Sequence, residues 1–192
     1  MSVTRVPYSI EEWGVGEVWF DGDRLVWHEL PRPQPATVPR GTRARARHTP
    51  TQGGANDPPP LRSTVPGKRT HRSNGSEPIA NQLVHRIRAY FGGVRESFAD
   101  VELELEGWTA FQIAVLDALR TVPYGDTVSY GELAHLAGYP RAQRAAGTFC
   151  ARNRFALVVP CHRVVGADGL GSYGSLGVEY KRRLLALERV PV

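Results

Sequence analysis

The stretch SYGELAHLAGYPRAQRAAGTFC, residues 129–150, predicts two short helices joined by a tight turn. Ser129 and Glu132 have the spacing of a capping box, which begins a helix, and Gly138 suits the turn that ends it. Pro140 suits the first turn of a second helix, which is rich in Ala and Gly and so able to approach another surface closely. Two such helices are a helix-turn-helix candidate, and an ordinary helical hairpin is the alternative.

A cysteine follows the helix pair at the end of an apolar run. Residues 155–159, FALVV, predict a buried strand that leads into PCHR at residues 160–163. In an extended strand, Cys161 and His162 point to opposite faces and pair directly only if the chain turns there. A histidine that is backed by a carboxylate lowers the pKa of a thiol and favours the nucleophilic thiolate. The alternative is a small buried Cys161 beside a hydrogen-bonded core His162.

The chain beyond the cysteine predicts a loop and a closing helix. Residues 170–177 hold three glycines, two serines and one tyrosine, a composition typical of a loop that wraps a ligand. Residues 178–189 predict a helix that turns Leu184, Leu185 and Leu187 inward.

The N-terminal part predicts a small α/β module. Residues 16–20 and 25–30 are apolar runs joined by an Asp-Gly turn, which indicates a hairpin. Residues 79–91 have helical spacing, and residues 101–106 alternate apolar and acidic side chains as a half-buried strand does. Because an isolated hairpin is marginally stable, we expect it to pack against this helix.

We therefore expect two domains, 1–107 and 108–192, the second beginning with a helix capped by Thr109. The first is interrupted over residues 31–78, which carry nine Lys and Arg against two acidic residues and ten of the fifteen prolines. The rest of the chain has a net charge of −2, from 15 basic and 17 acidic residues. The segment 31–78 buries too little apolar surface to order itself, so we predict a disordered basic insert that attracts DNA non-specifically.

Composition excludes several classes of protein. No apolar stretch is long enough to cross a bilayer, and the first residues lack the apolar run of a signal peptide, so we expect a cytoplasmic protein without a membrane partner. Cys150 and Cys161 are too few for a disulfide scaffold or a zinc site of CxxC pairs. His28 and His85 have no cysteine near them in the N-terminal module, so we expect no metal and no cofactor.

The run PCHRVV, residues 160–165, resembles the active-site signature of the O6-alkylguanine-DNA alkyltransferases, the methylated-DNA–protein-cysteine methyltransferases. Residues 122–134, 141–145 and 181–188 are similar to the family's segment before the helix-turn-helix, its recognition helix and its closing helix. The resemblance is ungapped from residue 108 to 188. It implies an α/β (α+β) fold, in which a small RNase H-like α/β module precedes an all-helical, winged-helix-like domain that carries the active-site cysteine.

The resemblance also implies the activity, which is DNA repair by direct, irreversible, single-turnover alkyl transfer from O6-alkylguanine, or from O4-alkylthymine, after nucleotide flipping. It implies that Cys161 accepts the alkyl group, that His162 polarises the thiol through a water and that Glu188 orients His162. It further implies that Asn153 fixes the turn around the cysteine and that Tyr130 donates a hydrogen bond to the flipped guanine. The plainer alternatives are a core aromatic for Tyr130 and a surface carboxylate for Glu188.

An O6-alkyl group is buried in the base stack, so its removal requires that the nucleotide be flipped out and the gap filled. The resemblance assigns Arg144 as the finger that fills the gap, and the alternative is a solvated helix charge. The resemblance implies that the recognition helix enters the minor groove of double-stranded DNA, and binding there is largely sequence-independent and salt-sensitive. We also expect the protein to be a monomer. The residues expected to contact the DNA or to line the guanine pocket are Tyr130, Arg141, Arg144, Arg163, Val164, Tyr173 and Ser175.

Three features depart from the family pattern. Arg154 stands where the family usually has a proline after Asn153, residues 172–177 shift the tyrosine by one position and place Leu176 where glycine is usual, and the insert is additional. The altered loop keeps one competing hypothesis open, that of an alkyltransferase-like protein that binds lesions without transfer. Two further alternatives are disfavoured. A helix-turn-helix regulator would need a regulatory domain, and a cysteine hydrolase would need an oxyanion-hole glycine motif, and the sequence resembles neither.

Overall fold

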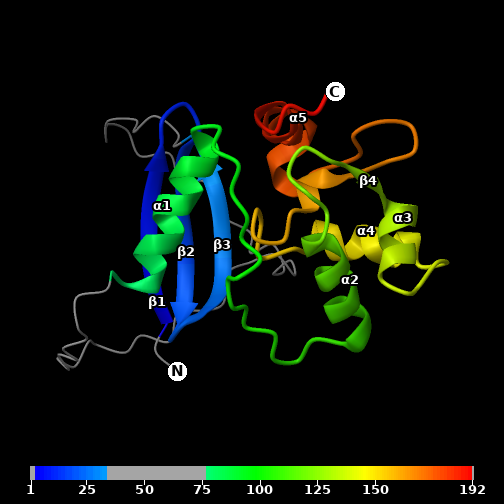
Figure 1. Cartoon of the computed structure of the whole chain (residues 1–192), viewed down its shortest axis with the longest axis horizontal. Coiled ribbons are helices and arrows are strands. Elements are labelled where there is room, and N and C mark those ends of the chain that lie inside the picture. The colour runs from blue at the N-terminus through cyan, green and yellow to red at the C-terminus, as the bar shows by residue number, and fades with distance from the viewer. Residues whose placement is uncertain (1–2, 34–76, 192) are drawn as a thin grey trace, which may run out of the picture.

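The structure, a computed structural model, describes residues 3–33 and 77–191 (Figure 1). The insert expected over residues 31–78 lies almost wholly outside these residues. At its start, strand β3 continues to Arg32, so the folded part extends slightly further than predicted.

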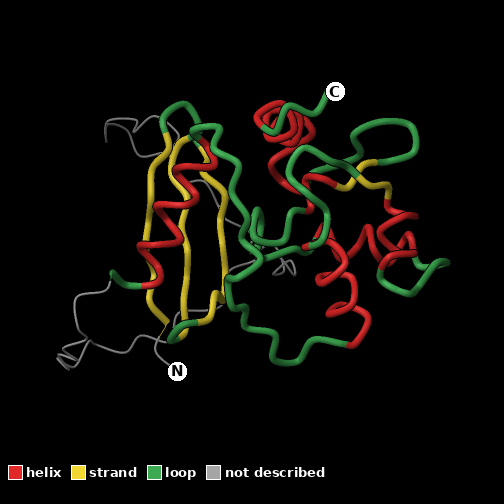
Figure 2. The backbone as a smooth tube through the Cα atoms, viewed as in Figure 1, coloured by secondary structure: helices red, strands yellow, loops and turns green. Residues whose placement is uncertain are grey.

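The N-terminal module is an antiparallel sheet with one helix against it (Figures 1 and 2). Its strands are β1 (Val3–Ile10), β2 (Gly14–Asp21) and β3 (Arg24–Arg32), in that spatial order. Helix α1 (Ile79–Phe91) has the predicted bounds and buries Leu83, Ile87 and Tyr90. The predicted hairpin is confirmed as β2 and β3. We did not predict β1, in which Tyr8 is the one fully buried side chain.

The strand predicted at residues 101–106 is wrong. Only Leu103 forms a bridge, to Leu25 of β3, and two backbone hydrogen bonds link Leu25 to Glu102 and Glu104. The alternation still buries Val101 and Leu103, because the segment passes along the edge of β3 before it leaves for the next helix.

The C-terminal part contains four helices and a short parallel sheet. The helices are α2 (Ala110–Arg120), α3 (Tyr130–Leu136), α4 (Gln143–Ala151) and α5 (Gly177–Leu187), the strands are β4 (Val128–Ser129) and β5 (Val164–Val165), and two 3-10 turns are η1 (Cys161–Arg163) and η2 (Gly174–Leu176). The expectation of an all-helical domain is therefore corrected. Both predicted caps are present as complete capping boxes, at Thr109 and at Ser129.

Two predictions for this part are wrong, the start of one helix and the presence of one strand. Helix α4 begins at Gln143, so Pro140 and Arg141 lie in the preceding turn. Residues 155–159 form a buried turn and not a strand, because the chain has to reverse between α4 and Cys161 within a few residues. The reversal is closed by a hydrogen bond from the Val159 N–H to the Phe155 carbonyl.

His28 joins the two modules. Its backbone N–H donates to the Arg154 carbonyl at 2.8 Å. Its ring is buried, with Nδ1 2.5 Å from the Ala156 carbonyl oxygen and Nε2 2.6 Å from the Tyr8 hydroxyl. A neutral imidazole satisfies both contacts, since Nδ1–H donates and Nε2 accepts. Strand β3 is thereby tied to the turn that leads to Cys161.

We expect His28 to make the protein less stable in mild acid. Burial lowers the pKa of His28 from 6.5 to about 4, and the bond to Ala156 opposes this shift. The unfolded chain therefore takes up a proton at a higher pH than the folded chain, so the contribution is complete above pH 6.5 and is lost as the pH falls through 4. The loss amounts to about 3 kcal/mol.

Urea unfolding of the wild type and His28→Gln at pH 7 and in mild acid checks this expectation. The glutamine does not titrate, so the variant should lose less stability between the two pH values. Equal losses in the two proteins would contradict the assignment to His28.

Candidate active site

Cys161 is the first residue of η1 and is 6% exposed. The side chain of Asn153 holds the turn around it. The Asn153 amide nitrogen donates to Sγ at 3.0 Å and to the Val159 carbonyl at 2.7 Å, and its oxygen accepts from the Phe155 N–H. Burial raises the pKa of Cys161, against the opposing effects of the Asn153 bond and the charge of Lys181. The resting group is thus a thiol, and its use as a nucleophile requires a base.

His162, the residue after the cysteine, forms a buried pair with Glu188. His162 Nε2 lies 2.8 Å from Glu188 Oε1, and both side chains have no exposed surface. Burial lowers the pKa of His162, and Glu188 opposes the shift only in part, so the ring is neutral. Because Glu188 accepts the Nε2–H, Nδ1 carries the lone pair, and it has no hydrogen-bond partner among the described residues. The pair of His162 and Glu188, called the relay below, thus presents one free basic nitrogen, Nδ1 of His162.

Glu188 is held by several donors. Burial alone would raise the pKa of Glu188, but hydrogen bonds and charges from His162 and Arg163 outweigh it and keep that pKa well below its ordinary value. The backbone N–H of Gly125 also donates to Oε2, at 3.2 Å. The alternative of a surface carboxylate at Glu188 is therefore wrong, since it is 2% exposed.

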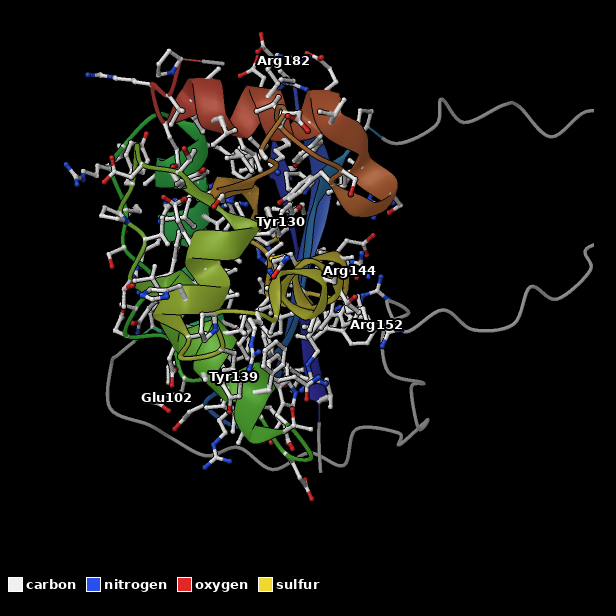
Figure 3. The ribbon with its side chains drawn as sticks, turned by 90° about the vertical axis from the view of Figure 1, so that its right-hand side faces the viewer. Glu102, Tyr130, Tyr139, Arg144, Arg152 and Arg182 are labelled. Carbon is white, nitrogen blue, oxygen red and sulfur yellow. The ribbon has the colours of Figure 1, made fainter. Side chains whose placement is uncertain are left out.

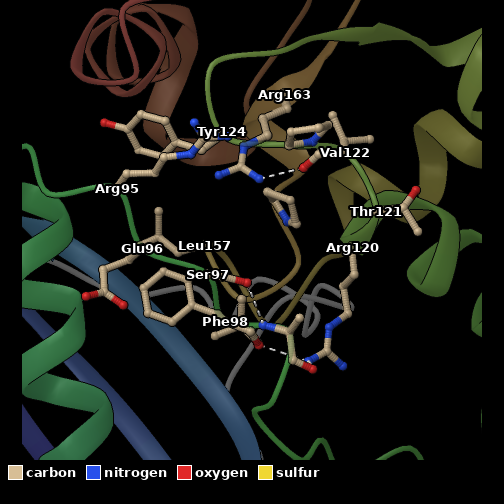
Figure 4. A pocket seen from close by; sticks show the side chains of 14 residues that line it. Arg95, Glu96, Ser97, Phe98, Arg120, Thr121, Val122, Tyr124, Leu157 and Arg163 are labelled. Atoms are coloured by element: carbon tan, nitrogen blue, oxygen red, sulfur yellow. Dashed lines mark hydrogen bonds between the residues drawn. The ribbon is translucent and has the colours of Figure 1, made fainter.

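The expectation that Arg163 contacts DNA is also wrong. Its guanidinium is buried against Glu188, with Nε 3.0 Å from Oε2 and NH2 2.9 Å from Oε1. NH1 donates to the Val122 carbonyl at 2.7 Å, as Figure 4 shows at the edge of a cavity of about 440 Å³. A buried carboxylate needs a paired cation, and this requirement turns Arg163 inward.

Two residues of the site escaped the sequence analysis. Tyr90 reaches Glu188 from α1, in the other module. Lys181 is fully buried on α5, and its ammonium donates at 2.5 Å to the carbonyls of Val164 and Leu170. Lys181 thus joins both ends of the segment that leads into the glycine-rich loop. A lysine inside an apolar helical pattern was the available signal for it, whereas nothing local marks Tyr90.

The expected guanine-pocket residues lie near the cysteine. Tyr130 begins α3, and its ring lies against Gly147 of α4 and Gly171 of the loop, where an added Cβ would come within 3.7 Å and 3.5 Å of Tyr130 atoms. An added Cβ at either glycine would therefore make an ordinary van der Waals contact with Tyr130. Burial raises the pKa of Tyr130, so its hydroxyl remains a donor.

A cavity of about 400 Å³ borders Cys161. Its lining includes Cys161, Tyr173 and Ser175 and, from β3, Trp27 and Arg32. The Arg32 guanidinium donates to Ser175 Oγ at 3.1 Å, so the two modules meet at this loop. Val164 is fully buried, and its carbonyl keeps a second lone pair beyond the bond from Lys181. Cys150 lines the same cavity, and burial raises the pKa of this second thiol.

Three arginines around α4 are exposed, namely Arg141, Arg144 and Arg152. Figure 3 shows Tyr130, Arg144 and Arg152 on one face, with Arg182 at the far edge. Arg154 differs, because it is half-buried, lies over the Trp108 ring and donates to the Glu104 carbonyl. Arg154, which stands where the family usually has a proline, therefore ties the turn before Cys161 to residue 104 of the N-terminal module.

Two features are absent from the described residues, 3–33 and 77–191. No group of three or more His, Cys, Asp or Glu side chains is arranged to hold a metal ion there. No helix in this part of the chain is long and apolar enough to span a membrane.

The chain is similar to known proteins over most of its length. The family model of the 6-O-methylguanine DNA methyltransferase DNA-binding domain matches residues 110–190. A methylated-DNA–protein-cysteine methyltransferase of Mycobacterium tuberculosis is 46% identical over 130 residues, which are 67% of this chain and 76% of the relative. One from Methanosarcina acetivorans is 46% identical over 114 residues, 59% of this chain and 71% of the relative.

Solved structures agree with these relatives. The M. tuberculosis O6-methylguanine methyltransferase superposes with a TM-score of 0.65 at 29% identity, covering 100% of this chain and 96% of that one. The M. tuberculosis protein in complex with DNA gives a TM-score of 0.64 at 33% identity, covering 98% and 95%.

Proposed function

The chain belongs to the family of methylated-DNA–protein-cysteine methyltransferases, and from this premise we propose that it repairs DNA by moving an alkyl group from O6-alkylguanine to its own Cys161. The observation that carries the assignment of the acceptor is the buried arrangement behind Cys161. Asn153 holds the sulfur, and the His162–Glu188 pair presents a single free nitrogen.

The proposed chemistry follows from the protonation states. The Cys161 thiol gives its proton to Nδ1 of His162, through a water, and Glu188 stabilises the imidazolium that forms. The thiolate attacks the alkyl carbon, a C–S bond forms and the C–O6 bond breaks. The electron pair passes to the guanine, where the Tyr130 hydroxyl donates a hydrogen bond to the developing anion. A thioether has no easy leaving path, so each molecule acts once.

The proposed path to the base requires flipping. Arg144 fills the gap left in the duplex while Arg141 binds the backbone, and both are exposed near α4. Val164, Tyr173 and Ser175 line the pocket for the guanine. DNA is the partner, and we propose that the protein acts on alkylated double strands as a monomer in the cytoplasm. The RNase H-like and winged-helix-like descriptions of the two modules stay predictions.

The function is tested by intact-protein mass spectrometry after mixing with a duplex that carries one O6-methylguanine. A stoichiometric gain of one methyl mass is expected. Tight binding of the lesion without a mass gain would instead support the non-transferring alternative and point to the altered loop at residues 172–177. A parallel duplex with O4-methylthymine measures the preference between the two lesions.

Arg144→Ala should separate flipping from chemistry. We expect methyl transfer from the duplex to slow at least about tenfold, because the flipped state loses the side chain that replaces the base. Reaction with the free base O6-benzylguanine, which needs no flipping, should keep its wild-type rate. Arg182→Ala is the matched control, since Arg182 is an exposed arginine on α5 paired with Glu179. Equal slowing with both substrates would contradict the finger role.

A further inference from the structure

The hydroxyl of Tyr90 enters the relay from the N-terminal module. Tyr90 lies on α1 and is fully buried. Its Oη donates to Glu188 Oε1 at 2.7 Å and lies 3.3 Å from His162 Nε2. Its ring meets the His162 ring nearly edge-on, with the centroids 6.4 Å apart. One residue of α1 therefore touches both members of a pair that lies 72 and 98 positions later in the chain.

Packing alone does not account for this hydroxyl. The ring contacts Phe91, Phe98 and Tyr124 at centroid distances of 5.5, 6.2 and 6.0 Å, contacts that a phenylalanine ring would make equally well. A buried hydroxyl without a partner costs free energy, and here the partner of the Tyr90 hydroxyl is a carboxylate. Burial and the nearby Glu188 charge raise the pKa of Tyr90 well above its ordinary value, so the hydroxyl is a donor at any working pH.

Three residues donate hydrogen bonds to one oxygen of Glu188. Oε1 accepts from Tyr90 at 2.7 Å, from His162 at 2.8 Å and from Arg163 at 2.9 Å. Arg163 also bonds Oε2, so it fixes the plane of the carboxylate. The Tyr90 hydroxyl contacts both Oε1 and His162 Nε2, so it limits how far the His162 ring can move relative to Oε1. The Nδ1 side of the ring offers no restraint, since Nδ1 has no partner among the described residues.

We propose that Tyr90 is a positioning residue for alkyl transfer, which holds Glu188 and the His162 ring so that Nε2 keeps its proton and Nδ1 is the base. This inference rests on the proposed function. It makes helix α1 a part of the reaction machinery, because the relay is complete only when the N-terminal module is docked on the C-terminal part.

Tyr90→Phe removes the hydroxyl and keeps the ring. We expect the second-order rate of methyl transfer to Cys161 at neutral pH to fall about tenfold, the size expected for one lost hydrogen bond to a charged group. The ¹⁵N imidazole spectrum of His162 should change from the Nε2–H tautomer to a mixture of both tautomers. A purely structural role would not move that spectrum while the protein stays folded.

Tyr124→Phe is the matched control. The Tyr124 hydroxyl donates to the Leu187 carbonyl, next to Glu188 in the chain, and touches none of the relay atoms. This variant should keep the wild-type rate and the wild-type His162 spectrum.

An unchanged His162 tautomer in Tyr90→Phe would overturn the inference, whatever the rate. The same holds for a rate loss that merely follows the unfolded fraction. The spectrum does not depend on transfer, so it separates the two proposals: a wild type that takes no methyl refutes the proposed function, whereas the tautomer still tests the role of Tyr90.

Discussion

Cys161→Ser should gain no methyl mass from a duplex with O6-methylguanine, while the wild type gains one methyl group per molecule. A serine hydroxyl stays protonated beside His162 and is a far weaker nucleophile than a thiolate. The change is nearly isosteric, and Asn153 still finds an acceptor in the hydroxyl. The variant should therefore fold and bind the lesion duplex, and only the transfer should disappear.

Cys150→Ser is the control for this experiment. Cys150 lines the same cavity, but burial raises the pKa of its thiol strongly. Unlike Cys161, it is not followed in the sequence by a histidine. It should take up one methyl group as the wild type does, and peptide mapping should place that group on Cys161. A methyl group found on Cys150, or in the Cys161→Ser protein, would refute the proposed acceptor.

Glu188→Gln should damage both stability and reaction. The amide carries no charge, so Arg163 becomes a buried cation without a counter-ion. Breaking one side of a buried pair costs about 3 kcal/mol or more. The imidazolium of His162 also loses its stabilising charge, and we expect transfer to slow at least about a hundredfold. Urea unfolding and a time course of the methyl mass gain measure the two effects.

The difference in stability between the wild type and Glu188→Gln should decrease as the pH falls. The pKa of Glu188 lies well below its ordinary value in the folded protein, so its stabilisation is complete above about pH 4.5 and is lost as the pH falls further. The stability gap between wild type and Glu188→Gln should therefore narrow in acid.

Glu179→Gln is its control, because Glu179 lies on the same helix in an exposed pair with Arg182, and such pairs contribute little. A gap that stays constant down to strong acid, or an equal loss in Glu179→Gln, would contradict the buried-pair account.

Local patterns predicted the helices well. Thr109 and Ser129 cap their own helices through hydrogen bonds that span three residues, so the signal and the structure occupy the same few positions. The same patterns failed at residues 101–106 and 155–159. An alternating or continuous apolar pattern indicates burial, and most apolar side chains of these two segments are buried, but a strand also needs a partner along its length. Each segment has a single bridge to β3.

The amino-acid sequence by itself determined the capped starts of α2 and α3, the glycine turns and the motif that carries Cys161 and His162, since each depends on neighbours a few residues apart. Only the tertiary structure decided that Arg163 points inward to Glu188, that His28 ties β3 to the turn before the cysteine, and that Tyr90 completes the relay. These contacts join residues that are 25, 128 and 98 positions apart. Their physical cause is the cost of burying polar groups without partners, a cost that arises only once the folded chain buries these distant residues together.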